Sequence, residues 1–195
     1  MSDDLLGRWL AALVDTAGLT SLALPEARRM LLEDSLRAAP LVRGLEGPLV
    51  DVGSGGGAPG IPLAASLPEL EVTLLDAERK KCDFLERWTG ELANLTVIWG
   101  RAEEQPTDTY GVAVAKALAP PAVAAEWCLP LVRPGGSVVL FVGPSADVGA
   151  VARVAEQVGG GAPELREGLL TIPKMAPTPA GFPRRAGVAR KRPLA

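Results

Sequence analysis

Residues 49–60 run Leu-Val-Asp-Val-Gly-Ser-Gly-Gly-Gly-Ala-Pro-Gly, and this stretch decides the fold. Its apolar start predicts a short buried strand. A helix is predicted to begin at Gly60, with its first N–H groups directed back at the turn. Between them the backbone can turn sharply and approach a ligand closely at three glycines, Gly53, Gly55 and Gly57. The stretch therefore predicts the first strand–helix unit of a doubly wound nucleotide-binding sheet.

Two aspartates narrow the choice of nucleotide. Asp51 stands two residues before the first glycine, and Asp76 ends a second predicted strand 25 residues later. A carboxylate at the position of Asp76 can accept both ribose hydroxyls of NAD or of S-adenosylmethionine (SAM). Asp51 would repel a pyrophosphate, whereas SAM carries an ammonium and a sulfonium. We therefore expect a SAM site, and a dinucleotide site or a glycine turn without a ligand remains as an alternative.

Apolar patterns along the chain alternate between strand and helix. Helices are expected at 3–15, 25–42, 60–67, 79–93, 120–131 and 145–158, and strands at 49–53, 71–76, 95–99, 112–115, 137–142, 165–172 and 184–192. The last strand is expected to be antiparallel. The pattern predicts an α/β fold of the class I SAM-methyltransferase type, Rossmann-like and doubly wound, with a mostly parallel seven-stranded sheet. Residues 1–46 are expected to form an N-terminal helical cap, and residues 47–195 the methyltransferase domain. All four tryptophans are expected mostly in the core, Trp9, Trp88, Trp99 and Trp127.

Composition excludes several classes of chemistry. The chain has no histidine, so Ser-His-Asp and Cys-His catalysis are impossible, and we expect no metal site. Its two cysteines, Cys82 and Cys128, lack CxxC spacing and are expected to be buried free thiols of a cytoplasmic protein. No apolar run of eighteen residues and no leader-like N-terminus occurs, so neither a membrane span nor a signal peptide is expected.

The charge is unevenly distributed along the chain. The net charge is −3, yet six basic residues and no acidic one follow Gly168. A basic end on an acidic body is typical of a surface that contacts nucleic-acid phosphates. We expect RNA contacts from the last of these residues, namely Arg184, Arg185, Arg190, Lys191 and Arg192.

The segments after the third and fourth strands predict the rest of the site. Ala102 and Glu103 are expected to lie over the adenine. Lys116 is expected beside the methyl group as the catalytic residue, in contact with cofactor and substrate. The sequence after Lys116 lacks the Asn/Asp-Pro-Pro-aromatic motif of exocyclic amine methyltransferases, and Cys128 does not follow a proline, as the catalytic cysteine of cytosine C5 enzymes does. An acceptor with a free lone pair, such as guanine N7, needs neither a base nor a nucleophile, because positioning suffices.

Several segments together resemble the bacterial GidB/RsmG family, which methylates N7 of a guanine in the 530 loop of 16S rRNA. The most specific is 51–63, in which Pro-Gly-Ile-Pro-Leu continues the glycine turn. The others are 75–85, Leu19-Thr20, Asp34-Ser35-Leu36, 182–187 and 191–194. The resemblance covers the chain from about residue 18.

The resemblance implies a cofactor, a partner and site residues. Gly53, Ala58, Ala102 and Glu103 fall on the family's SAM-binding positions, and Lys116 falls where an arginine is usual. Gly18 replaces the asparagine that normally precedes Leu-Thr. The implied partner is 16S rRNA or the small ribosomal subunit, and the implied state is a monomer without membrane association. The alternatives are a methyltransferase for another RNA site or a small molecule, a non-catalytic SAM-binding module that docks on RNA, and an NAD(P) oxidoreductase.

Overall fold

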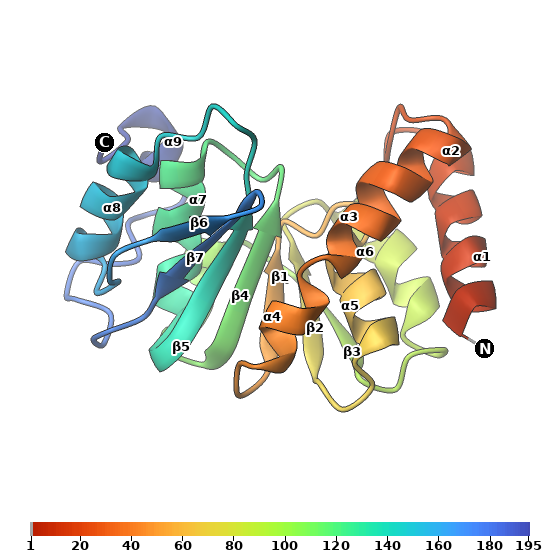
Figure 1. Cartoon of the computed structure of the whole chain (residues 1–195), viewed down its shortest axis with the longest axis horizontal. Coiled ribbons are helices and arrows are strands. Elements are labelled where there is room, and N and C mark those ends of the chain that lie inside the picture. The colour runs from red at the N-terminus through yellow and green to blue at the C-terminus, as the bar shows by residue number, and fades with distance from the viewer. Residues whose placement is uncertain (1) are drawn as a thin grey trace.

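A computed structural model describes residues 2–195 and contains a seven-stranded sheet in the order β3-β2-β1-β4-β5-β7-β6 (Figure 1). The first five strands in this order run parallel, and β7 and β6 pair antiparallel. Their bounds are β1 Leu49–Val52, β2 Val72–Asp76, β3 Leu95–Trp99, β4 Tyr110–Lys116, β5 Val132–Phe141, β6 Glu164–Arg166 and β7 Leu169–Pro173. The predicted fold class is confirmed.

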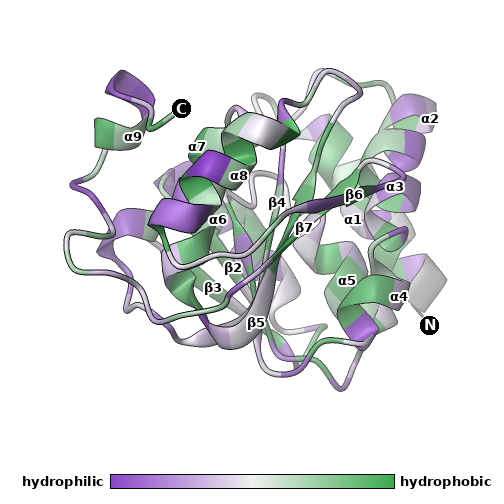
Figure 2. Ribbon diagram, turned by 60° about the vertical axis from the view of Figure 1, so that its left-hand side comes forward, coloured by the Kyte–Doolittle hydropathy of each residue, from purple (hydrophilic) through white to green (hydrophobic). Residues whose placement is uncertain are grey.

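Helices cover both faces of the sheet, as Figure 2 shows with α7 and α8 on one side and α4 and α5 on the other. Successive strand residues point to opposite faces, so β1 sends Leu49 into one buried cluster and Val50 into the other. The helices are α1 Ser2–Asp15, α2 Leu24–Ala27, η1 Arg28–Glu33, α3 Asp34–Leu36, α4 Ala39–Arg43, α5 Gly60–Ser66, α6 Arg79–Leu85, η2 Glu86–Trp88, η3 Ala102–Glu104, α7 Pro121–Cys128, η4 Leu129–Leu131, α8 Val148–Gln157 and α9 Val188–Lys191. Among residues 2–195, no helix combines the length and apolar character that crossing a membrane requires.

The N-terminal helices share the larger buried cluster with the sheet. Trp9 and Leu13 of α1 are buried there together with residues of α5 and α6. Trp9 also donates a hydrogen bond from Nε1 to the carbonyl oxygen of Gly56 at 2.8 Å. The cap thus fixes the glycine turn from outside the sheet.

The single helix expected at 25–42 is instead divided. Its centre, Arg28–Glu33, is a π-helix, and the chain makes a turn after Leu36 before α4 begins at Ala39. Pro40 lacks an N–H group, which explains why a new helix must start at this point. Similarly, α6 ends at Leu85, well before the predicted end at residue 93.

The strand predicted at 165–172 is present as two strands, and the strand predicted at 184–192 is wrong. The strand expected at 165–172 is a hairpin, because Glu167 and Gly168 take positive φ angles of 49° and 78° and form a two-residue turn between β6 and β7. The segment 184–192 contains a helix, α9, rather than a strand. β6 therefore forms this edge of the sheet, and the C-terminal segment adds no strand to it.

Most predictions on buried residues are correct, with one exception. Cys82 and Cys128 are free and buried, as expected. Trp9, Trp88 and Trp127 are buried, but Trp99 is 58% exposed at the edge strand β3. The Arg79 guanidinium lies 5.3 Å from the centre of the Trp99 ring, so a cation–π contact replaces burial in the core.

Candidate cofactor site at the carboxyl edge of the sheet

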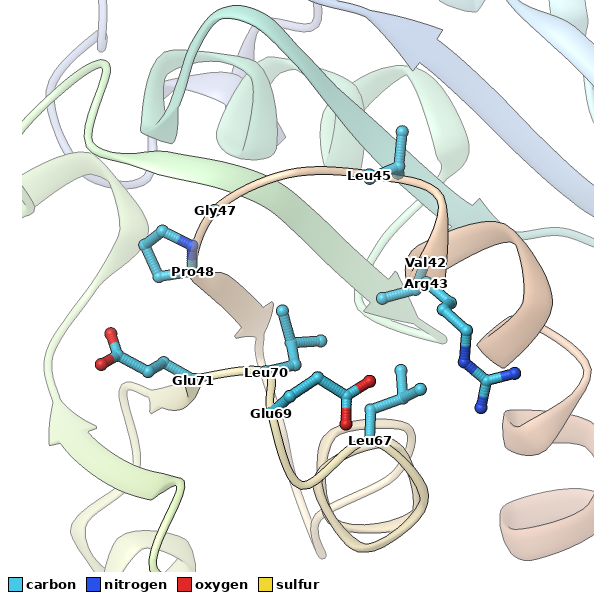
Figure 3. A pocket seen from close by; sticks show the side chains of 9 residues that line it. All are labelled: Val42, Arg43, Leu45, Gly47, Pro48, Leu67, Glu69, Leu70 and Glu71. Carbon is cyan, nitrogen blue, oxygen red and sulfur yellow. The ribbon is translucent and has the colours of Figure 1, made fainter.

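One cavity lies at the wrong edge of the sheet for the predicted ligand. It has a volume of about 380 Å³ and is lined by residues of α4 and of the segments that lead into β1 and β2, among them Arg43, Pro48 and Glu71 (Figure 3). We call it the amino-edge cavity. Ligands of open α/β sheets bind outside the carboxyl ends of the strands, so this cavity is not a candidate for the nucleotide site.

A second cavity, of about 350 Å³, lies at the carboxyl ends of β1, β2 and β3 and beside the segment that follows β4. We call it the carboxyl-edge cavity. In the order β3-β2-β1-β4-β5, strands β2 and β3 lie on one side of β1, and β4 and β5 lie on the other. Folds of this type bind ligands at this switch point between β1 and β4. The lining is Val52, Gly53, Leu75, Asp76, Ala77, Glu78, Lys81, Gly100, Arg101, Ala102, Glu103, Ala117, Leu118, Trp127, Gly187 and Arg190. Four of the predicted cofactor residues are among them: Gly53, Asp76, Ala102 and Glu103.

The glycine turn needs glycine at its first position. Gly53 has a φ of +71°, and a Cβ placed there would lie 2.3 Å from Cδ1 of Leu118. A side chain would therefore collide with a residue that lines the cavity. Gly55, Gly57 and Ala58 shape the turn but do not line the carboxyl-edge cavity.

Asp76 joins the turn to the end of β2. Its Oδ2 accepts a hydrogen bond from the N–H of Gly55 at 2.8 Å, and its Oδ1 accepts one from the N–H of Glu78 at 2.9 Å. The side chain lines the cavity although the residue is only 5% exposed. Each carboxylate oxygen retains further acceptor capacity, so two ribose hydroxyls can still donate to Asp76.

Asp51 lies behind the turn and does not line the cavity. It is fully buried, and its Oδ2 accepts a hydrogen bond from the N–H of Gly60 at 2.9 Å. Its Oδ1 has no hydrogen-bond partner among the described residues. Burial raises the pKa of Asp51 to about 7, and the nearby charge of Asp76 acts in the same direction. The structure therefore gives Asp51 a role in closing the turn onto α5.

The C-terminal segment forms one wall of the same cavity. Glu103 accepts a hydrogen bond from the N–H of Gly187 at 3.1 Å through Oε1. The Arg190 guanidinium lies 5.5 Å from the centre of the Trp127 ring and donates to the carbonyl oxygen of Leu118 at 3.3 Å. Sequence reasoning missed Trp127 and Arg190 as cavity residues, because no local pattern indicates that α9 packs beside α7.

The basic C-terminal residues fall into two groups. Arg184 donates from Nε and Nη2 to the two carboxylate oxygens of the buried Glu126, at 2.5 and 2.6 Å. Arg184 therefore anchors the segment to α7 and is not available as a free cation. The other four predicted RNA contacts are exposed: Arg185, Arg190, Lys191 and Arg192.

Lys116 ends β4, as predicted, but its side chain turns to the helical cap. Nζ forms an ion pair with Asp34, donates to the carbonyl oxygen of Met30 at 2.5 Å and lies 4.9 Å from the centre of the Phe141 ring. Burial lowers the pKa of Lys116 despite the partner carboxylate. Lys116 lines a third cavity and not the carboxyl-edge cavity. Its contact with the cofactor stays a prediction.

Comparison of the sequence with known proteins identifies the family of this chain. A family model for GidB, rRNA small subunit methyltransferase G, matches residues 7–156. The ribosomal RNA small subunit methyltransferase G of Moorella thermoacetica is 36% identical over 165 residues, which are 75% of this chain and 69% of that protein. The protein of the same name from Pelotomaculum thermopropionicum is 40% identical over 178 residues, 82% of this chain and 74% of that protein.

Comparison of structures supports the same fold. A SAM-dependent O-methyltransferase from Thermotoga maritima superposes with a TM-score of 0.63 at 13% identity, covering 88% of this chain and 72% of that one. At this identity the likeness concerns the fold alone. The family assignment depends on the sequence matches, which span most of the chain. On this basis the chain belongs to the GidB family, rRNA small subunit methyltransferase G.

Proposed function

We propose that this protein transfers a methyl group from SAM to N7 of a guanine in the 530 loop of 16S rRNA. The observation that carries the proposal is the carboxyl-edge cavity of a GidB-family chain, formed at the switch point of the sheet by a glycine turn and the carboxylate of Asp76. The relatives named above are methyltransferases of small-subunit rRNA. Family and cavity thus point to the same activity.

The lining of the cavity fits SAM in its donors, acceptors and space. Gly53 leaves room that a Cβ would fill, beside the apolar side chains of Val52 and Leu118. Asp76 would accept hydrogen bonds from the ribose hydroxyls. Ala102 would lie against the adenine, and Trp127 is a further apolar side chain of the lining. The lining carries both signs of charge, and the carboxylate of Asp76 next to the glycine turn suits a positively charged ligand better than a pyrophosphate at that point.

The chain itself has little proton chemistry to perform. When bound, SAM supplies an electrophilic methyl group, and transfer to N7 uses the ring nitrogen's lone pair, leaves the C–S electron pair on sulfur and releases no proton. No general base is then needed, which agrees with a chain without histidine. The protein's contribution is to hold donor and acceptor in line and to exclude water, which can account for a large part of the rate.

The RNA-binding surface proposed here is the exposed basic end of the chain. Arg185, Lys191 and Arg192 are exposed, and they flank Arg190, which borders the carboxyl-edge cavity. Phosphates bound by these side chains would run past the mouth of the cofactor site. Such contacts release counterions, so RNA affinity should fall steeply with salt concentration.

Three further expectations complete the proposal. The protein acts as a monomer, which light scattering of the purified chain can test. It works in the cytoplasm, where small ribosomal subunits are found. Residues 1–46 form a helical cap on the methyltransferase unit of residues 47–195, and both are needed for activity.

The test uses radiolabelled SAM with the purified protein and small-subunit rRNA from a strain that lacks the gene. We expect label in the RNA, and strand cleavage at one guanine after chemical treatment that breaks the chain at 7-methylguanine. Labelled RNA that is not cleaved by this treatment would point to another acceptor atom. Binding of SAM without labelling of RNA or subunits would favour a different substrate, and no SAM binding would refute the proposal.

A further inference from the structure

A third cavity lies between the helical cap and the carboxyl end of β4. It has a volume of about 480 Å³, and we call it the cap cavity. Its lining is Arg29, Met30, Glu33, Asp34, Arg37 and Lys116. The lining combines three cationic and two carboxylate side chains, and these hydrogen-bond donors and acceptors together suit a nucleotide.

The cap cavity and the carboxyl-edge cavity are joined through a few residues. Lys116 lines the first, while the next two residues, Ala117 and Leu118, line the second. Ala117 takes a positive φ of 53°, which is uncommon for a residue with a side chain and turns the chain sharply between the two. A molecule in the cap cavity would thus be separated from a cofactor in the carboxyl-edge cavity by the segment from Lys116 to Leu118.

The cap itself carries a backbone feature that is frequent at functional sites. Arg29, Met30 and Glu33 belong to the π-helix η1, which is a rare conformation. All three side chains line the cavity. Met30 is 42% exposed there, an apolar side chain available to pack against a flat ring.

Asp34 and Lys116 place a hydrogen-bond acceptor and a donor side by side in the cavity, where a nucleotide base could bond to both. Asp34 accepts from Nη1 of Arg37 at 2.7 Å and is paired with Lys116, and its side chain remains 31% exposed. Partial burial would raise the pKa of Asp34, but the hydrogen bonds and charges of Lys116 and Arg37 bring it below its usual range. Asp34 is therefore ionised at neutral pH and accepts hydrogen bonds only.

We propose that the cap cavity receives the acceptor guanine, with Asp34 accepting from N1–H and the 2-amino group while Lys116 donates to O6. This inference rests on the proposed function. The Watson–Crick edge would then be held by the cap, and N7, on the other edge of the ring, would remain free to face the cofactor. Arg29 and Arg37 would lie near the adjoining phosphates. The cap would thus set base specificity in addition to its packing role.

The test compares two bases in four proteins. The substrates are small-subunit rRNAs carrying guanosine or inosine at the methylated position, since inosine lacks only the 2-amino group. The proteins are the wild type, Asp34→Asn, Lys116→Met and the control Arg43→Ala, which removes a cap arginine at the amino-edge cavity. Affinity for S-adenosylhomocysteine is measured first, and thermal melting confirms folding.

We expect the wild type to prefer guanosine by about tenfold to a hundredfold in kcat/KM, the size of one hydrogen bond to a charged group. Asp34→Asn should bring this ratio close to one. Lys116→Met should slow both bases by a similar factor, because both carry O6, and Arg43→Ala should match the wild type. Affinity for S-adenosylhomocysteine should be unchanged in all four proteins.

The outcomes separate this inference from the proposed function. A wild type that labels guanosine RNA without preference over inosine would refute the role of Asp34, and this result requires no variant. Asp34→Asn that keeps the wild-type ratio, or variants that lose cofactor affinity instead of base preference, would also overturn it. A wild type that binds SAM but labels neither RNA would refute the proposed function and the inference with it.

Discussion

The buried carboxyl group of Asp51 should make the protein less stable as the pH rises. Asp51 is fully buried behind the glycine turn, with one hydrogen bond from Gly60 and one oxygen without a partner among residues 2–195. Burial disfavours the ionised form and raises the pKa from 3.8 to about 7. Between these two values the folded protein holds a proton that the unfolded chain has already released.

The sign and size follow from linkage. Because the folded state binds more protons in this window, the free energy of unfolding falls as the pH rises. The contribution is fully present below about pH 4 and is lost as the pH passes through 7. The two pKa values differ by about three, and each pKa unit corresponds to about 1.36 kcal/mol, so the loss is about 4 kcal/mol. For a chain of this length, that equals a change in Tm of roughly 8–16 °C.

The measurement is the difference in stability between the wild type and Asp51→Asn from pH 4 to pH 8, without ligand. Asparagine retains an acceptor for the Gly60 N–H and does not titrate, so the difference isolates Asp51 from all other groups. We expect the wild type to lose stability relative to the variant as the pH rises. A flat or rising difference for Asp51→Asn would refute the reasoning.

Three further predictions concern the turn and the C-terminal segment. Arg184→Ala should lower the free energy of unfolding by about 3–5 kcal/mol in urea denaturation, because the buried Glu126 loses its partner. Gly53→Ala should cost about 1–3 kcal/mol through its positive φ and weaken binding of S-adenosylhomocysteine in calorimetry. The matched control Gly90→Ala, where a Cβ meets nothing within 4 Å, should leave that binding unchanged. Arg190→Ala should weaken cofactor binding by removing a wall of the cavity, and unchanged affinity would contradict its placement there.

The central part of the fold was predictable because its signals are local. The glycine turn, the strands β1 to β3 and the carboxylate of Asp76 depend on residues within a few positions of one another. Alternation of apolar residues located the strands, and backbone flexibility of glycine located the ligand edge. These features coincide with the part of the chain that forms the carboxyl-edge cavity.

The errors lie where distant contacts decide the structure. The segment 184–192 has no strong pattern of its own, and its helix forms where Ala189 packs into the cluster that contains α7. Lys116 was correctly placed at the end of a strand, but only the cap determines which way its side chain points. Trp99 was expected in the core because aromatic residues favour burial, yet it lies on an edge strand under Arg79. None of these contacts can be inferred from spacing alone.

The hydrogen bonds of the glycine turn agree better with a cationic ligand than with a pyrophosphate. In dinucleotide folds, the turn and the helix N-terminus direct free N–H groups at phosphate oxygens. Here two of those groups are taken by the protein's own carboxylates, Gly55 N–H by Asp76 and Gly60 N–H by Asp51. The turn therefore offers a ligand fewer N–H donors, and the carboxylate of Asp76 lies beside it. A pyrophosphate would meet repulsion without compensating hydrogen bonds, whereas an ammonium or a sulfonium would be attracted. The same arrangement places the charge of Asp76 near Asp51 and contributes to its raised pKa.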